Sequence, residues 1–404
     1  KKPHEPSCQS HQLSPSASKR LITPSAIPLS LYLHLPWCTQ KCPYCDFNSH
    51  EGFTPELQGP YVSALLQDFD SQLPEISGRL VESIFIGGGT PSLFSGEWIQ
   101  RLLSGLAERM PFAPGAEITL ESNPGSAERG RYQSYLEAGV TRLSIGVQSF
   151  NDGALGRLGR IHSGDDARQA LHLVSTAGFQ NWNIDLMHGL PGQTTDTAAA
   201  DLLEALALSA GHISWYQLTI ERNTRFWTSQ PELPSETTLE AIQSTGEQLL
   251  SDAGYHQYEV SAYCRPGYES RHNLNYWGFG DYVGLGAGAH GKISCNDGQI
   301  IRTQRTRSPA DYLALITNGL MPAPRGNAIS QQERVVEYVM NALRLKSGSP
   351  VGDFTQRTGL PLRQLERAAE QAQSRGWIQH LDSGSLRATP LGYQFLDSVV
   401  ASFL

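Results

Sequence analysis

Three cysteines that fall within eight residues, Cys38, Cys42 and Cys45, constrain this chain more than any other feature of its sequence. They follow residues 29–35, where leucines alternate with Ser, Tyr and His in the pattern of a strand with one apolar face. Pro36 ends that strand. One short loop could therefore wrap all three sulfurs around a single inorganic centre. Because thiolates are soft ligands that favour zinc or iron–sulfur clusters, the loop predicts a metal site.

The number of ligands separates the two kinds of metal. Structural zinc takes four protein ligands, and the candidates for a fourth, His34, His50 and Cys8, stand at no usual finger spacing. A four-iron cluster normally takes four cysteines, so three would leave one iron open to a small molecule. Zinc stays open as an alternative. So do three cysteines without any metal, although free cysteines rarely cluster in this way.

Strand and helix patterns alternate from residue 29 onward. Strands are predicted at residues 29–35, 81–91, 116–124, 142–150, 181–191 and 212–220, and helices at 60–73, 96–110, 126–139 and 194–209. This alternation is typical of a parallel sheet that closes, fully or partly, into a barrel. We therefore expect an α/β fold with a partial (β/α)6 barrel, followed by a small α+β region and a winged-helix-like domain.

Polar residues stand at or just beyond the ends of the predicted strands. They are Gly87 to Thr90, Glu121, Asn123, Gln148, Asp185, Tyr216 and Gln217. Barrel active sites are built at the carboxyl ends of the strands, so these residues predict a ligand cup on the rim that carries the cysteines. Each also has a simpler interpretation. The glycines could form a plain turn, and Glu121 could cap a helix or be solvated. Asp185 lies in a buried-looking run and needs a partner, which a ribose would provide.

Four segments are expected along the chain. Residues 1–28 are rich in Ser and Pro and predict a disordered tail. Residues 29–260 form the barrel, and 261–328 form a connecting region. Residues 329–404 have the order of a winged helix, but their eight Lys or Arg against seven Asp or Glu provide no basic face for DNA.

The composition indicates in which compartment the protein works and which partners are unfavourable. The chain has 404 residues and a net charge of −8, which does not favour a nucleic-acid partner. Six cysteines, three of them in one loop, indicate a reducing compartment, and no apolar run reaches the length of a membrane span. We expect a soluble cytoplasmic protein. An organelle matrix is the alternative if the tail is a transit peptide, although no Arg-rich amphipathic helix is visible in it.

The cysteine loop, CxxxCxYC directly after a strand, resembles the signature loop of the radical S-adenosylmethionine (SAM) enzymes. That resemblance implies a [4Fe-4S] cluster on Cys38, Cys42 and Cys45, with SAM on its open iron. It further implies SAM contacts by Tyr32, Gly88, Gly89, Thr90, Glu121, Gln148, Arg160 and Asp185. The motifs GGGTPS, ESNP, GVQSF, IDLMHGLPGQ and RHNLNYW together resemble the oxygen-independent coproporphyrinogen III oxidase-like group. Within it they are most similar to the HemW-like haem-chaperone branch.

Two features separate the branches of that group. The coproporphyrinogen enzymes carry a further cysteine two residues after the third ligand, where this chain has Phe47. His272 begins the HNxxYW pattern, which the resemblance associates with haem, and a histidine beside flat aromatic surface suits an axial ligand. His272 is therefore a tentative haem ligand, with Cys264, His290 and Cys295 as secondary candidates. A structural role for His272 is the alternative.

The resemblance implies a haem chaperone that binds haem, a [4Fe-4S] cluster and SAM and passes haem to acceptor proteins, with respiratory haem proteins as candidates. It also implies an electron donor such as flavodoxin or ferredoxin. Coproporphyrinogen dehydrogenase activity is the alternative function and is not expected because of Phe47. A radical enzyme acting on RNA is the third alternative, disfavoured by the acidic balance.

Overall fold

One twisted sheet organises the molecule. The computed structural model describes residues 22–125, 130–320 and 326–404. Twelve strands join in the order β12-β11-β10-β9-β1-β2-β3-β4-β5-β6-β8-β7. Its centre is the predicted run of six parallel strands: β1 (Leu29–Leu35), β2 (Val81–Gly88), β3 (Phe112–Ser122), β4 (Arg142–Gln148), β5 (Asn181–His188) and β6 (His212–Gln217). The expected partial barrel is confirmed.

The alternation of leucines in β1 predicts one buried face, but the strand is buried on both faces. Six of its seven residues are buried, so both of its faces are covered. Ser30 makes this possible, because its hydroxyl is hydrogen-bonded to Ser83 of β2 at 2.7 Å inside the sheet's concave side. Parallel strands are commonly buried on both faces because the crossover helices cover one of them.

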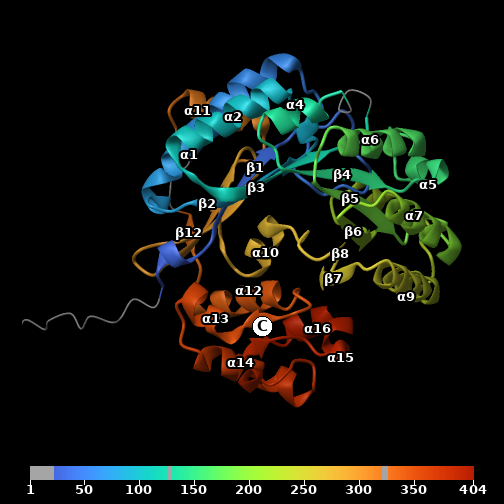
Figure 1. Cartoon of the computed structure of the whole chain (residues 1–404). Coiled ribbons are helices and arrows are strands. Elements are labelled where there is room, and N and C mark those ends of the chain that lie inside the picture. Colours follow the sequence, from blue (N-terminus) through green and yellow to red (C-terminus); the bar gives the residue numbers. More distant parts are fainter. Residues whose placement is uncertain (1–21, 126–129, 321–325) are drawn as a thin grey trace, which may run out of the picture.

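Helices cover the convex side of the sheet (Figure 1). They are α1 (Gln58–Ile76), α2 (Gly96–Arg109), α4 (Tyr132–Glu137), α5 (Asp152–Arg157), α6 (Gly164–Thr176), α7 (Thr195–Ala207) and α9 (Glu236–Asp252). The short α8 (Arg225–Thr228) lies instead beside the cysteine loop, where Phe226 N donates to Pro43 O at 3.0 Å. Two of the longer helices begin at a residue that caps the helix amino end. Ser163 and Thr194 each accept a hydrogen bond from the third helical N–H of α6 and α7 in a capping box.

Residues 261–328, expected as a connecting region, extend this sheet at both edges. On one edge β8 (Ala262–Cys264) pairs antiparallel with β6 and with β7 (His256–Glu259). On the other, β9 (Asp281–Leu285) lies parallel to β1, and β10 (His290–Ser294), β11 (Ile300–Gln304) and β12 (Asn327–Ala328) follow it. Between the two edges the chain forms α10 (Arg271–Trp277), which crosses the concave side of the sheet (Figure 1). Helix α11 (Pro309–Thr317) packs against α1.

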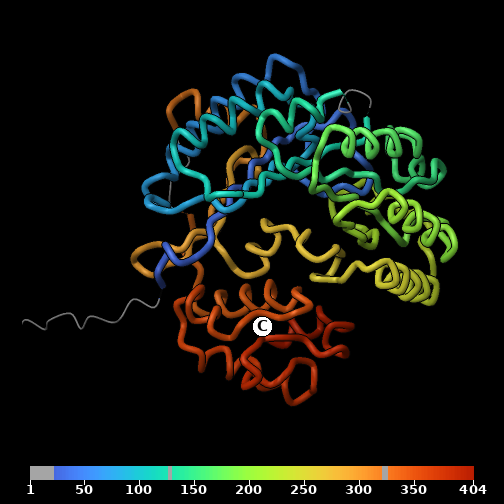
Figure 2. Tube along the Cα trace, in the orientation of Figure 1, coloured from blue at the N-terminus to red at the C-terminus, as the bar shows by residue number. Residues whose placement is uncertain are grey.

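The C-terminal residues have the winged-helix order. Helix α12 (Gln331–Ala342), strand β13 (Ser349–Pro350) and helices α13 (Val351–Thr358) and α14 (Arg363–Ser374) are followed by a hairpin containing β14 (Ser385–Leu386). Helices α15 (Pro390–Gln394) and α16 (Leu396–Ala401) close the domain. The domain lies beyond α10, away from the helices that cover the sheet (Figure 2).

The disordered-tail prediction for residues 1–28 does not hold for residues 22–28. Ile22 and Ile27 are 4% and 3% exposed and belong to the hydrophobic core of the C-terminal domain. Local periodicity could not reveal this, because the partners of the two side chains lie in another domain. Residues 1–21 lie outside the described residues.

Candidate functional site

A cavity of about 630 Å³ opens at the carboxyl ends of the parallel strands. The three cysteines of the loop after β1 lie on its wall. So do seven of the eight residues predicted to bind SAM: Gly88, Gly89, Thr90, Glu121, Gln148, Arg160 and Asp185. Five different strands or the loops after them supply these groups. The parallel register therefore brings together residues far apart in the sequence.

Backbone hydrogen bonds join the two ends of the cysteine loop to each other. Cys38 N donates to His50 O at 2.8 Å, and His50 N donates to Pro36 O at 2.7 Å. Burial is the main cause that raises the pKa of the Cys38 and Cys45 thiols. These sulfurs are therefore protonated until a metal displaces their protons.

The glycine loop after β2 brings bare backbone up to the cysteine loop. Gly89 N donates to Leu35 O at 2.9 Å, and Thr90 N donates to Trp37 O at 2.7 Å. A Cβ at Gly89 would lie 2.5 Å from Trp37 O, and Gly88 has φ +122°. Only glycine satisfies both conditions. The glycines therefore allow the backbone of this loop to lie against the backbone of the cysteine loop, which a plain turn would not require.

Two partly buried carboxylates, Glu121 and Asp185, line the cavity. Glu121 accepts a hydrogen bond from Gly88 N at 3.2 Å. Burial, and then repulsion from Asp185, raise the pKa of Glu121 to about 8. Asp185 accepts hydrogen bonds from Asn183 Nδ2 at 2.7 Å and from Ser144 Oγ at 3.1 Å, and burial raises its pKa as well. A cation, or a pair of hydroxyl donors, would stabilise these groups.

Arg160 and Gln148 complete the wall from β4 and the loop after it. Arg160 Nη2 donates to Asn123 Oδ1 and to Gly146 O, both at 2.7 Å, and its Nη1 lies 3.6 Å from Cys42 Sγ. Gln148 has φ +69°, a strained conformation for a residue with a side chain, and its Oε1 accepts from Tyr216 OH at 2.8 Å. Such strain persists where the surrounding structure enforces it, as it commonly does in binding sites.

Tyr32 is the predicted SAM residue that does not line this cavity. Its hydroxyl is hydrogen-bonded to His34 Nδ1 at 3.0 Å, and its ring stacks on Phe85 with centroids 6.3 Å apart. Tyr32 thus lies beneath the glycine loop, where it supports His34 against Gly88.

Sequence reasoning missed the contribution of α10 to the cavity. Asn273 and Trp277, the second and last residues of the HNxxYW pattern, line the same cavity as the cysteines. Trp277 Nε1 is buried without a hydrogen-bond partner among the described residues. The motif was the available signal, but its sequence gave no reason to place it against the rim. Ser144 and Ser214, small polar residues inside β4 and β6, also line the cavity and were not predicted.

His272, the tentative haem ligand, points to the other side of α10. It is 7% exposed, its Nδ1 lies 3.3 Å from Ser83 Oγ, and its ring packs on Phe85 with centroids 5.1 Å apart. Burial lowers its pKa to about 3, so the imidazole is neutral. Among the described residues, His272 lines neither the cavity at the carboxyl ends of the strands nor the one at their amino ends. In this conformation its nitrogens are not accessible to a porphyrin iron.

The secondary haem candidates are dispersed. His290 is exposed at the start of β10, whereas Cys295 lies buried just after it. Cys264 is buried on β8, at the opposite edge of the sheet. The structure therefore does not bring these three residues together with His272.

Comparison with known proteins assigns the chain to a family. The model of the radical SAM superfamily matches residues 32–204, and that of the HemN C-terminal domain matches residues 329–395. The heme chaperone HemW of Escherichia coli is 46% identical over 93% of this chain and 98% of its own length. HemW of Haemophilus influenzae is 44% identical over 94% and 99%. This chain belongs to the HemW family of radical SAM proteins.

A solved structure supports the fold of this HemW family member. The coproporphyrinogen III oxidase HemN of Escherichia coli superposes with a TM-score of 0.78 over 93% of this chain and 90% of its own, at 23% identity. In the part of the chain that the structure describes, no helix is long and apolar enough to cross a membrane.

Membership of the radical SAM family implies a [4Fe-4S] cluster and SAM, and the cavity fits both. Three thiols on one wall match a cluster with one iron left open. Two carboxylates with raised pKa values suit a cationic ligand, and the Arg160 and Trp277 side chains each keep a buried N–H without a partner. When bound, the cluster and SAM supply one-electron radical chemistry. The residues that line the cavity would hold them and exclude water.

Proposed function

We propose that this chain is a haem chaperone that binds haem, a [4Fe-4S] cluster and SAM and transfers haem to acceptor proteins. The observation that carries the proposal is the 46% identity to a heme chaperone over 98% of that relative's length. So long a match includes the cysteine loop, the HNxxYW helix and the C-terminal domain together. Similarity confined to the barrel would support only radical SAM chemistry.

The partners follow from that role. Haem acceptors, with respiratory haem proteins as candidates, would receive the cargo, and a flavodoxin or ferredoxin would reduce the cluster. The cytoplasm is the compartment where a cluster with an open iron and flavodoxin-type donors occur together, so we propose it as the location of this chain.

Phe47 distinguishes the proposed function from porphyrinogen oxidation. The likeness to the HemN oxidase at 23% identity supports the shared fold only. Phe47 lines the cavity and is 60% exposed, where the coproporphyrinogen enzymes are expected to carry a cysteine. An apolar ring there can donate no hydrogen atom or proton to a substrate. RNA as a substrate is disfavoured by the net charge of −8.

A second cavity, at the amino ends of β1 to β3, suits haem. It has a volume of about 460 Å³, within the usual range for small-molecule sites. Leu80, Pro114 and Leu274 offer apolar surface, and the guanidinium groups of Arg271 and Arg357 suit the two propionates of haem. Arg357 is ion-paired with Asp353 at 3.1 Å and would have to exchange that partner for a propionate. Glu82 also lines this cavity, and its carboxylate would need to turn away from the propionates.

His272 lies directly behind this second cavity. Ser83, its hydrogen-bond partner, is part of the cavity wall, as are Leu274 and Asn275 of α10. Axial ligation by His272 therefore requires α10 to move away from β2. The chain leaves this short helix through Gly278, Phe279 and Gly280, and Phe279 is buried in the core of the C-terminal domain. A movement of α10 would therefore also displace Phe279 from that core. We propose that haem enters at this cavity and that His272 reaches the iron once α10 has moved.

The decisive experiment is a reduced, anaerobic assay with SAM in which coproporphyrinogen and haem are offered in parallel. We expect stoichiometric haem binding and transfer to an apo-haem protein, with no decarboxylated product. Sustained porphyrinogen turnover would refute the chaperone function, however well the protein also held haem.

The haem position is tested separately by spectroscopy. Arg271→Ala with Arg357→Ala should weaken haem binding, and His272→Ala should shift the Soret band. The matched control is Arg101→Ala, since Arg101 is exposed on α2 and lines neither cavity. Unchanged haem affinity in the double arginine variant would overturn the second cavity as the haem site, and an unshifted Soret band would remove His272 as the ligand.

A further inference from the structure

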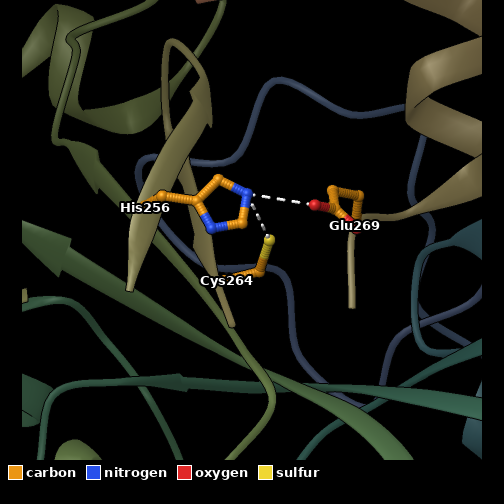
Figure 3. A group of neighbouring side chains, drawn as sticks. All are labelled: His256, Cys264 and Glu269. Carbon is orange, nitrogen blue, oxygen red and sulfur yellow. Dashed lines mark hydrogen bonds and ion pairs between the residues drawn. The ribbon is translucent and has the colours of Figure 1, made fainter. Parts of the chain in front are cut away.

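A second set of metal-binding side chains lies outside the SAM cavity, on the β7–β8 hairpin at the edge of the sheet (Figure 3). His256 of β7 and Cys264 of β8 are directly opposed in the antiparallel register, so their side chains share one face. Glu269 approaches the same point from the loop that precedes α10. Residues eight and five positions apart thus converge only because the hairpin and this loop fold together.

The geometry differs from that of a catalytic triad. Glu269 Oε1 lies 3.0 Å and Cys264 Sγ 3.6 Å from the same atom, His256 Nε2. In a nucleophile–base–acid relay the carboxylate meets Nδ1 and the nucleophile meets Nε2. A single Nε2 carries at most one proton and cannot serve both neighbours. The three potential ligand atoms all lie within 4.8 Å of one another, so one cation between them would satisfy all three.

We propose that His256, Cys264 and Glu269 bind one Zn²⁺ ion. Imidazole, thiolate and carboxylate are the three ligand types of zinc sites, whereas a thiolate is unsuited to Mg²⁺ or Ca²⁺. Three protein ligands leave one position for water. The His256 and Glu269 side chains are 45% and 27% exposed, which leaves the site open to solvent, whereas Cys264 is buried.

The surroundings of the site orient its ligands. Gly267 N donates to Glu269 Oε2 at 3.1 Å and so leaves Oε1 directed at His256. Cys264 packs in a small apolar cluster with Tyr258 and Ala262, and Tyr268 covers its side. Hydrogen bonds and packing of this kind fix metal ligands in their binding orientation.

A metal here would connect the edge of the sheet to the SAM cavity. Glu269 directly precedes Ser270, whose Oγ accepts from Asn273 N at 3.3 Å and starts α10. Asn273 and Trp277 then line the cavity. We therefore assign the ion a structural role, in which it fixes the β7–β8 hairpin to the start of α10.

The test measures zinc and iron in the same cluster-loaded protein. After anaerobic dialysis against zinc-free buffer, elemental analysis should find about one zinc per chain beside the iron of the cluster. Cys264→Ser should lose the zinc and keep the iron. Cys295→Ser, a change at another buried cysteine, should keep both.

A second measurement covers the case in which Cys264→Ser is poorly folded. In the full chain with Cys8, Cys38, Cys42 and Cys45 replaced by Ala, one equivalent of Co²⁺ should produce a thiolate-to-cobalt charge-transfer band that Zn²⁺ abolishes. His256→Ala and Glu269→Gln change partly exposed side chains, and each should weaken Co²⁺ binding at least about tenfold with an unchanged circular dichroism spectrum. Failure to bind one equivalent, or a band that survives loss of Cys264, overturns the site. Neither readout involves haem.

Discussion

The residues that line the cavity at the carboxyl ends of the strands form two chemical groups, which we propose bind iron and SAM. The three thiols come from the loop after β1, while Glu121 and Asp185 are partly buried carboxylates of β3 and β5. A carboxylate with a raised pKa gains most from a neighbouring cation. The sulfonium of SAM is a cation at every pH, so the two carboxylates and the cluster ligands can be tested independently.

The cluster assignment predicts a clear difference between cysteines. Cys38→Ala, Cys42→Ala and Cys45→Ala should each lose the cluster, because in the proposed three-ligand site each sulfur would bind an iron directly. The joint replacement of Cys8, Cys264 and Cys295 should keep it. Iron and sulfide analysis after anaerobic reconstitution measures the result. A cluster that follows the second group would contradict the assignment.

Asp185 should contribute to SAM affinity through a charged hydrogen bond. Asp185→Ala is expected to weaken SAM binding by about 1.5 to 3 kcal/mol, or roughly ten- to hundredfold, with the cluster retained. Calorimetry on the reconstituted protein provides the affinity. Asp165→Ala, at an exposed carboxylate on α6, is the control and should bind normally. If both variants bind SAM equally well, Asp185 is not a contact.

Glu121 should make SAM binding depend on pH. Its folded pKa of about 8 lies above its ordinary value of 4.5, so ionising it costs stability in the unliganded protein as pH rises through that window. A cationic ligand favours the ionised form and displaces the proton. Affinity should therefore rise by at most about tenfold per pH unit up to about pH 8 and then level off. Glu121→Gln should flatten this dependence, and calorimetry in two buffers should detect proton release in the wild type alone.

At the scale of elements, a buried ion cluster joins the strands added beside β1. Asp281 of β9 pairs with Arg79 before β2 and with Lys292 of β10, each at 2.8 Å. Burial opposes its ionised form, but the two cations lower its pKa overall. The contribution of Asp281 to stability is therefore present above its ordinary pKa of 3.8 and is lost as pH falls below it.

Removal of this carboxylate should be costly because it leaves two buried cations without a partner. Asp281→Asn is expected to lower the free energy of unfolding by about 3 to 5 kcal/mol. Asp70→Asn is the matched control, since Asp70 pairs with Arg109 at 2.7 Å on the surface. That change should cost less than about 1 kcal/mol. Urea denaturation at pH 7 compares the two, and equal midpoints would show that the buried cluster contributes no more than a surface pair.

For the whole molecule, the segment before β1 fastens the C-terminal domain to the barrel. Ile22 packs against α13's end, where a Cβ at Gly359 would lie 2.5 Å from its Cγ1, and Ile27 belongs to the same core. Phe279, which follows α10, is also part of that core. The position of the C-terminal domain and the position of α10 are therefore coupled.

Truncation of these isoleucines should loosen a domain that is about 300 residues away in sequence. Ile22→Ala and Ile27→Ala are each expected to cost about 2 to 5 kcal/mol, the usual range for such buried truncations. Hydrogen–deuterium exchange should increase in α12 and α13. Leu391→Ala, at a side chain that is 49% exposed, should change neither stability nor exchange. Unaltered exchange in both isoleucine variants would show that the contact is dispensable.

Short-range patterns were sufficient for much of this molecule. The six parallel strands, the cysteine loop, the rim residues and the winged-helix order follow from alternation, strand ends and spacing, which are local properties of the chain. Seven of the eight residues predicted to contact SAM line one cavity because parallel strands must end on the same edge. Phe47 and the HNxxYW motif likewise identified the family branch before any tertiary contact was known.

Long-range packing decided the rest. Ile22 and Ile27 carry no periodic signal, because their partners lie in another domain. Helix α10 has one face on the SAM cavity and His272 on the other, and only its docking across the concave side of the sheet determines which face is which. His256, Cys264 and Glu269 meet because a hairpin register and a loop bring them together. Contacts of this kind are set by tertiary packing, and no local spacing predicts them.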